Sequence, residues 1–145
     1  MMTLEEAFRK FKAKKWHSQM CWSAIADNSI SVITLWNHQI IRDKETRRMF
    51  YSCFEEDSVY WLDHAGNKKR KVHIQNSLDH HQGYFSAIEV FAHDAAFRPI
   101  AINKQVPMVN FWWKIKEFNA ETGEFSAECD ATIKREKNEL YPSFI

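Results

Sequence analysis

The chain has 145 residues, of which 45% are hydrophobic and 14% aromatic, which is enough material for one hydrophobic core. Its formal net charge of +1 excludes a histone-like basic coat, so any basic site must be local. With 3 Gly, 3 Pro and no run of Ser, Gly or Pro, the sequence contains no linker. We expect a single domain over residues 1–145, divided into an N-terminal helix (1–18), a curved sheet or barrel (19–133) and a charged tail (134–145).

The cysteines and the N-terminal stretch restrict the compartment. Cys21, Cys53 and Cys129 are widely separated and form no C-x-x-C pair, which argues against a disulfide framework and against a zinc knuckle. The N-terminal stretch has no apolar signal core, and no window approaches the roughly 18 apolar residues of a membrane span. We therefore expect a cytoplasmic protein with no membrane partner and no cofactor.

Two segments have helical patterns. Thr3-Leu4-Glu5-Glu6 has the form of a capping box, and Leu4, Phe8 and Phe11 follow at helical spacing, which predicts a helix ending near residues 16–18. The second pattern covers Val72–Gln82, with Gly83 where a C-cap glycine is expected. Before it, Asp63–Asn67 is typical of a turn.

The remaining apolar segments predict strands. They are a hairpin over Met20–Trp36 that turns at Asp27-Asn28-Ser29, single strands at Met49–Phe54, Val59–Leu62, Tyr84–Ala92 and Arg98–Ile102, and a C-terminal hairpin of Phe111–Lys116 and Phe125–Ile133. Strict alternation in the last hairpin indicates a sheet with one wet face. It places Trp113 on the apolar side and leaves Trp112 beside Lys114 and Lys116 on the wetter side.

About six to eight consecutive strands with one or two helices indicate an α+β domain. We expect a strongly curved, mostly antiparallel sheet or a small β-barrel, with an N-terminal helix and one short internal helix. In plan this arrangement is similar to PUA-like domains. A doubly wound parallel sheet is not expected because alternating strand and helix units are missing, and no glycine-rich phosphate loop is present.

The triplet Asp79-His80-His81 is spelled like the metal-binding triplet of the DHH phosphoesterases. Histidine spacing argues against a metal, because no two histidines are two, three or four residues apart. His73 and His80 share a helix face but would lie about 10 Å apart. We expect no metal, and we interpret His80 and His81 as polar contacts to a phosphate or base. A site assembled from separate elements, including His93 and Asp94, stays open.

Six tryptophans and three local basic clusters suggest nucleic-acid binding, because rings stack on unstacked bases while cations neutralise phosphates. The expected base pocket consists of Trp36, Tyr60, Trp61 and Trp112, and the expected phosphate contacts are Arg42, Arg47, Arg48, Lys68, Lys69, Arg70 and Lys71. This hypothesis requires the basic clusters to converge on one aromatic cavity.

No residue spacing selects a nucleophile or an acid–base pair, so we expect a binding module rather than an enzyme. The leading hypothesis is a module that holds an unstacked or modified base of single-stranded or duplex DNA, or of RNA, as in a restriction or defence system of a bacterium or phage. One alternative is a small-molecule-binding or enzymatic barrel with a pocket lined by Trp and His. Another is a protein-interaction domain or phage-type inhibitor that uses exposed aromatic side chains as hot spots.

Overall fold

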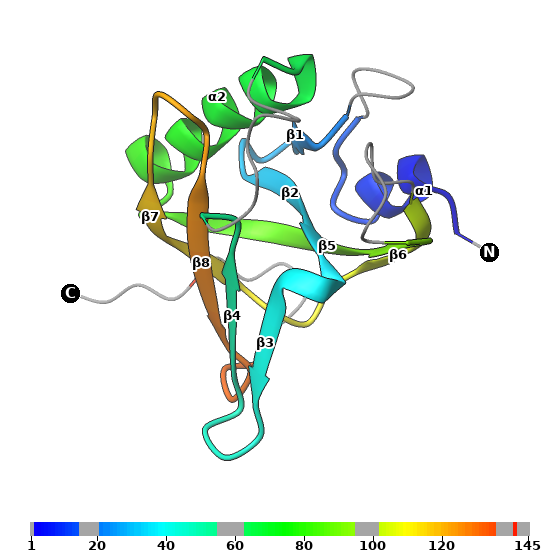
Figure 1. The fold of residues 1–145 in the computed structure, drawn as a ribbon, viewed down its shortest axis with the longest axis vertical. Helices are drawn as coiled ribbons and strands as arrows, with labels where there is room; N and C mark the ends of the chain where they lie inside the picture. The colour runs from blue at the N-terminus through cyan, green and yellow to red at the C-terminus, as the bar shows by residue number, and fades with distance from the viewer. Residues whose placement is uncertain (1, 15–20, 55–62, 95–101, 136–140, 142–145) are drawn as a thin grey trace.

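The computed structural model describes residues 2–14, 21–54, 63–94, 102–135 and 141 (Figure 1). These residues form an α+β domain with two α-helices, one short 3-10 helix and a mixed, mostly antiparallel sheet of eight strands. The elements are α1 (Leu4–Arg9), β1 (Ser23–Ile25), β2 (Ser31–Trp36), η1 (Asn37–Gln39), β3 (Ile40–Asp43), β4 (Arg48–Ser52), α2 (Ala65–His80), β5 (Tyr84–Ala92), β6 (Ile102–Pro107), β7 (Trp113–Phe118) and β8 (Phe125–Asp130).

Strand β5 is the centre of the sheet. The strand order is β1-β2-β5-β7-β8-β4-β3, and β6 adds to β5 beside β7. One edge of β5 pairs with β2 in parallel, and its other edge pairs antiparallel with β7 near Tyr84 and with β6 from Ile88 onward. All other strand pairs are antiparallel. Because β2 and β5 are parallel, the chain must cross over between them, and α2 is the helix of this crossover.

One face of the sheet, which we call the inner face, packs against α2. Its row of cross-strand neighbours runs through Phe85, Trp113, Cys129 and Met49. These residues are buried together with Ile74 of α2 in the largest apolar cluster. Alternation along the strands brings every second residue to this cluster, and burial of this apolar area is the main stabilising term of the domain.

The opposite, outer face is covered only in part. Val32 of β2 and Ile88 and Val90 of β5 pack there with Ala7 and Phe8 of α1 in a second apolar cluster. A third, smaller cluster contains Tyr84, Trp112 and Ile30, with Tyr141 of the C-terminal segment against it. Towards β8, β4 and β3 the outer face carries polar and exposed side chains. The sheet therefore has an inner face that α2 covers and an outer face that is open at its far end.

Several sequence predictions are confirmed. Thr3 caps α1 through a capping box, and the first hairpin turns between β1 and β2 at Asp27–Ser29. The prediction for Tyr84–Ala92 coincides with β5. Gly83 has φ +85° and donates its N–H to the carbonyl of Ser77, which ends α2 where the glycine signal placed its end.

Other predictions were wrong. Helix α1 ends at Arg9 instead of near residues 16–18, and the chain turns at Lys12 with φ +59°. Helix α2 begins at Ala65, so the predicted turn at Asp63–Asn67 is in fact its first turn, capped by the His64 side chain. The strands β3 and β6 were not predicted, because their short sequences lack a clear alternation of apolar and polar residues. Val59–Leu62 and most of Arg98–Ile102 lie outside the described residues.

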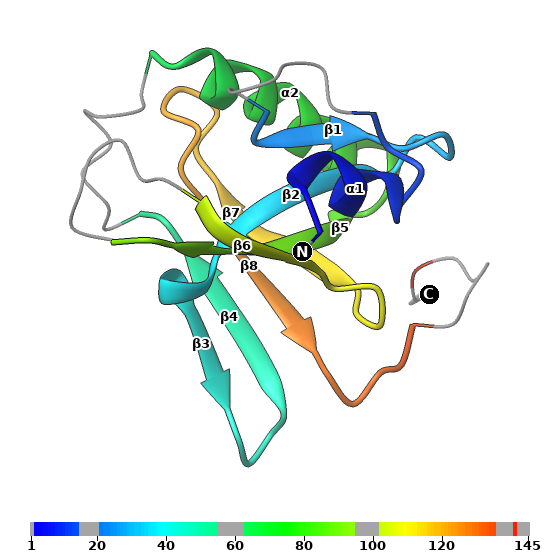
Figure 2. The same cartoon turned by 90° about the vertical axis from the view of Figure 1, so that its right-hand side faces the viewer.

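The sheet does not close into a barrel. Strands β1 and β3 stand at its two ends, and no pairing between them is present among the described strands. The β3–β4 hairpin instead extends away from α2, at the opposite end of the molecule (Figures 1 and 2). The domain is thus α+β with an open sheet, and the barrel expected as one of two alternatives is not what the structure has.

Helix α2 is tied to β1 and β2 through His73. The Ser23 hydroxyl lies 2.6 Å from His73 Nδ1, and the Ser31 hydroxyl donates to the His73 carbonyl at 2.7 Å. Burial, with a smaller contribution from the charge of Lys69, lowers the pKa of His73 from 6.5 to about 4. The imidazole is therefore neutral in the folded protein at neutral pH.

We predict that stability decreases as the pH falls from 6.5 towards 4. In this window the unfolded chain binds a proton at His73 that the folded chain does not, so protonation favours unfolding. The stabilisation is fully present above pH 6.5. Thermal unfolding measured by circular dichroism across this range should show a falling Tm, and His73→Gln should flatten the slope. An unchanged slope in that variant would show that other groups cause it.

A second stability prediction concerns Gly123 in the β7–β8 loop. It has φ +89°, and a Cβ there would lie 2.2 Å from Asn67 Oδ1 in α2. Gly83 has a similar φ, but its Cβ would meet nothing closer than 3.4 Å. Gly83→Ala should therefore cost about 1–2 kcal/mol from backbone strain alone. Gly123→Ala should cost about 3 kcal/mol or more because the clash adds to the strain. Urea denaturation of both variants measures the difference, and equal losses would contradict the close packing.

Candidate functional site

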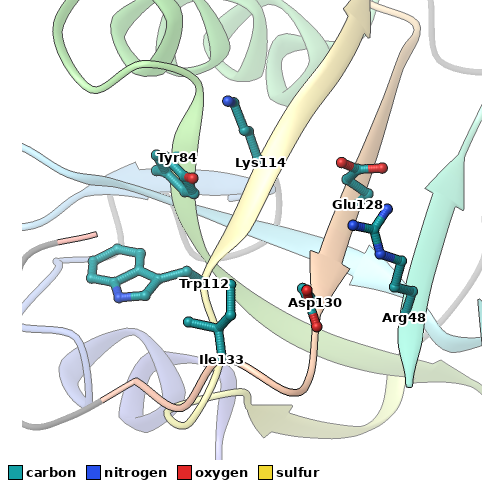
Figure 3. Close-up of a pocket in the computed structure, with 7 residues that line it drawn as sticks. All are labelled: Arg48, Tyr84, Trp112, Lys114, Glu128, Asp130 and Ile133. Atoms are coloured by element: carbon teal, nitrogen blue, oxygen red, sulfur yellow. The ribbon is translucent and has the colours of Figure 1, made fainter. Parts of the chain in front are cut away.

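A pocket of about 150 Å³ lies on the outer face, where the covering by α1 and the C-terminal segment ends (Figure 3). Four strands and the segment after β8 supply most of its walls. The lining residues are Arg48 of β4, Tyr84 of β5, Lys114 of β7, Glu128 and Asp130 of β8, and Trp112 and Ile133 outside the strands. Pockets for drug-sized ligands are about 300–1,000 Å³, so this one has room for a single ring or one small polar group.

Strand register brings these side chains together. Tyr84 pairs with Lys114, Lys114 with Glu128, and Arg48 with Asp130. Paired residues project to the same face, so alternation in β4, β5, β7 and β8 is sufficient to direct these five side chains outward. In Figure 3 the two rings stand on one side of the pocket and the Arg48 guanidinium reaches over β8 from the other side.

The two carboxylates of the pocket already have partners. Asp130 accepts from the Thr132 hydroxyl at 2.6 Å and from the Thr132 amide at 3.0 Å. These bonds, with a smaller contribution from the charge of Arg48, lower the pKa of Asp130. Glu128 lies 3.3 Å from the ammonium of Lys116. Both acids are therefore engaged by groups of the protein.

The two cations of the pocket are in a different situation. Within the described part of the chain, no carboxylate oxygen lies within 4.0 Å of a side-chain nitrogen of Arg48 or Lys114. The ammonium of Lys114 lies 5.2 Å from the centroid of the Tyr84 ring. Within the described residues neither cation is therefore held in a direct ion pair, although the charge of Arg48 acts on Asp130 and the formal charges of the pocket sum to zero.

The aromatic rings of the pocket are largely occupied by the protein itself. The Arg135 guanidinium lies 3.7 Å from the centroid of Trp112, and it also donates to the Ser86 hydroxyl at 2.9 Å. Burial lowers the pKa of Arg135 to about 10, which still leaves it charged at neutral pH. Tyr141 stacks on Tyr84 at 5.0 Å and meets Trp112 edge to face at 5.8 Å.

The four residues expected to form a base pocket are not gathered into one site. Trp36 packs beside the α1 cluster, whereas Trp112 belongs to the Tyr84 cluster. Trp112 is on the side of the sheet opposite Trp113, as alternation indicates, but it is buried, because Arg135 and Tyr141 cover it. Tyr60 and Trp61 lie outside the described residues.

The expected phosphate contacts also separate. Arg48 alone lines the pocket, while Arg47 lies in the β3–β4 turn with φ +60°. Lys68 and Lys69 are exposed on α2, and the Lys71 ammonium donates to the carbonyl of Glu121 at 3.2 Å. Since α2 and the β3–β4 turn lie at opposite ends of the molecule, the basic clusters do not converge on one cavity (Figures 1 and 2).

Two of the expected phosphate contacts have structural partners. Arg70 is buried, donates to Asn67 Oδ1 at 3.2 Å and places its guanidinium about equally far from the rings of Trp22 and Phe125, at 5.0 and 5.2 Å. Arg42 forms an ion pair of 2.8 Å with Glu89, whose side chain is 8% exposed. Neither arginine lines the pocket, and the guanidinium of Arg70 is buried between protein rings.

The histidine triplet lies at the end of α2. Asp79 and His80 are exposed, and Asp79 accepts from Gln75 at 2.8 Å. His81 is buried, with Nε2 2.9 Å from the Ser29 hydroxyl and Nδ1 3.4 Å from the Tyr141 hydroxyl. His81 therefore contributes to packing of the helix end. Within the described residues, no three His, Cys, Asp or Glu side chains are grouped as metal ligands.

Cys129 is buried on the inner face, as its alternation predicts. Burial, with a smaller contribution from Asp130, raises the pKa of its thiol to about 12, so the thiolate is not populated at neutral pH. None of the helices in the described part of the chain is long and apolar enough to span a bilayer.

Sequence reasoning missed Lys114, Glu128 and Asp130 as site residues, although their alternation with apolar neighbours was recognised. It also missed Arg135 and Tyr141, which only three-dimensional packing brings to Trp112. Comparison of the chain with models of protein families gives no match, and neither does comparison with curated proteins or with solved structures.

The Arg42–Glu89 pair generates a stability prediction. Arg42→Ala would leave a buried carboxylate with Asn37 as its remaining side-chain donor, at 2.7 Å, and should cost about 1–3 kcal/mol. Arg47→Ala is the matched control, because this exposed side chain has no ion pair within the described ranges and should change stability by less than about 0.5 kcal/mol. Chemical denaturation of both variants tests the structural role, which equal stabilities would contradict.

Proposed function

We propose that this domain binds a small phosphate-bearing ligand, a nucleotide unit either free or within a strand, in the outer pocket. The observation that supports this proposal is the pair of cations, Arg48 and Lys114, neither of which has a carboxylate oxygen within 4.0 Å in the described residues, beside one acid bonded to Thr132 and one paired with Lys116. An arginine and a lysine that line one small cavity can bind a phosphate group by charge-assisted hydrogen bonds.

The shape of the pocket favours a compact anionic group over an extended polyanion. Arg48 lies on β4 and Lys114 on β7, with β8 between these two strands. The two cations therefore flank a site about two strand spacings wide, or about 10 Å. The lysines of α2 lie elsewhere on the molecule and take no part in the proposed contact. The proposal therefore retains the nucleic-acid hypothesis only for a contact with one or two phosphates.

The proposal is a binding function and assigns no reaction. It retains Arg48 and Trp112 from the residues that the sequence analysis selected, and it adds Lys114. Trp112 has a positioning role in the pocket wall and does not stack on the ligand, because Arg135 covers its ring.

We predict that Arg48→Gln and Lys114→Gln each weaken binding of adenosine 5′-monophosphate by about tenfold or more, since each removes a charge-assisted hydrogen bond. Titration calorimetry measures the loss, and a single-stranded dT decamer in place of the mononucleotide distinguishes a free nucleotide from a strand. For the decamer, contacts to about two phosphates predict a slope near −1.4 for log K against log salt concentration.

The control is the double variant Lys68→Gln/Lys69→Gln on α2, which should bind both probes like the unmodified protein. A loss of decamer binding in this control comparable with that of Arg48→Gln would place the interface on α2 and overturn the proposal. Failure of both probes to bind the unmodified protein would overturn it as well.

A further inference from the structure

The outer face carries one continuous row of cross-strand neighbours beside the pocket. Ile41 of β3 pairs with Phe50 of β4, Phe50 with Glu128 of β8, and Glu128 with Lys114 of β7. Directly paired residues lie on the same face of a sheet, with adjacent strands about 4.8 Å apart. Phe50 is therefore the immediate neighbour of a residue that lines the pocket.

Phe50 differs from the other aromatic side chains of this face in what its ring contacts. The rings of Tyr84 and Trp112 are covered by Lys114, Tyr141 and Arg135. Within the described residues, the ring of Phe50 has no aromatic or cationic neighbour, and the residue is 37% exposed. Its ring face is thus available to a ligand, whereas those of Tyr84 and Trp112 are not.

Ile41, the cross-strand neighbour of Phe50, is also exposed, at 69%. Single exposed apolar residues are common on protein surfaces, but these two are cross-strand neighbours and adjoin a pocket lined by two cations. Such an arrangement matches a ligand that is anionic at one end and flat and weakly polar at the other.

The spacing along β4 matches the same ligand. Arg48 and Phe50 are two residues apart on one strand, so their side chains leave the same face with backbone positions about 6.8 Å apart. A phosphate held by Arg48 can therefore place the ring of the same nucleotide unit over Phe50. The pocket itself is too small for the whole unit, and the ring must lie outside it.

We propose that Phe50 is the stacking platform for the ring of the bound nucleotide unit, so that the site recognises a ring-bearing phosphate rather than phosphate alone. This inference rests on the proposed function. Base stacking on an aromatic side chain is sequence-tolerant because every base has a π-face, so the site distinguishes ring-bearing from ring-free phosphates more strongly than one base from another.

The test compares adenosine 5′-monophosphate with ribose 5-phosphate, which has the same phosphate and sugar but no base, by titration calorimetry. The unmodified protein should bind the nucleotide about tenfold or more tightly than the sugar phosphate. Phe50→Leu, which keeps an apolar side chain but removes the ring, should abolish this difference and leave ribose 5-phosphate affinity unchanged. Phe50→Trp should retain or increase it, and Ile41→Ala, with folding checked by circular dichroism, should leave most of it.

The outcomes separate this inference from the proposed function. Equal binding of both probes by the unmodified protein, or an unchanged nucleotide preference in Phe50→Leu, would overturn the role of Phe50 while leaving phosphate binding in place. An equal loss for both probes in Phe50→Leu would also overturn it, because Phe50 would then act by supporting the pocket. If neither probe binds the unmodified protein, the proposed function itself fails.

Discussion

The burial of β5 on both faces is the constraint on which the other elements depend. Seven consecutive residues of this strand, Tyr84–Val90, are buried. A strand in the middle of a sheet directs side chains to both faces, so both faces of β5 must be covered. Helix α2 covers one face and helix α1 covers the other. The parallel pairing of β2 with β5 then requires a crossover connection, and α2 is part of this connection. The same helix also covers the inner face of the sheet. Hydrogen bonds of His73 and Asn76 to β1, β2 and their turn fasten the helix in place.

The outer face follows from the same constraint. Helix α1 is only 6 residues long and reaches the β2–β5–β6 part of the sheet, so β7, β8 and β4 must be covered by something else or remain in contact with water. The segment after β8 covers the part nearest β5, where Arg135 lies between Trp112 and Phe11 with its guanidinium 5.1 Å from the Phe11 ring. The pocket begins where this covering ends. Its charged lining is thus a result of incomplete coverage of a sheet whose strands alternate apolar and charged residues.

Local patterns predicted those parts of the fold whose cause is local. The capping box at Thr3, the Gly83 stop signal and the turn at Asp27–Ser29 depend on neighbouring residues and were predicted. The length of α1 was overestimated because the Phe8 and Phe11 spacing continues past the point where Lys12 adopts a positive φ. The start of α2 was missed because Gly66 and Asn67 are typical turn residues, yet both are buried against other parts of the chain, Gly66 against Trp22 and Asn67 against Gly123.

In the candidate site, too, local patterns predicted some features, and contacts between distant residues decided the others. Trp112, Lys114 and Lys116 were placed on the wetter face by alternation alone, but only register between strands could show that Lys114, Glu128 and Phe50 are neighbours. Arg70 was assigned to phosphate because basic residues in a run are usually solvated, whereas the helix turns this one inward to Trp22 and Phe125. The sequence by itself determined the α+β class, the element signals and which residues of a strand share a face, because these depend on local geometry and on a period of two. Tertiary structure alone decided which basic groups are paired, which aromatic rings are covered and where the pocket lies, because these depend on contacts between residues far apart in the chain.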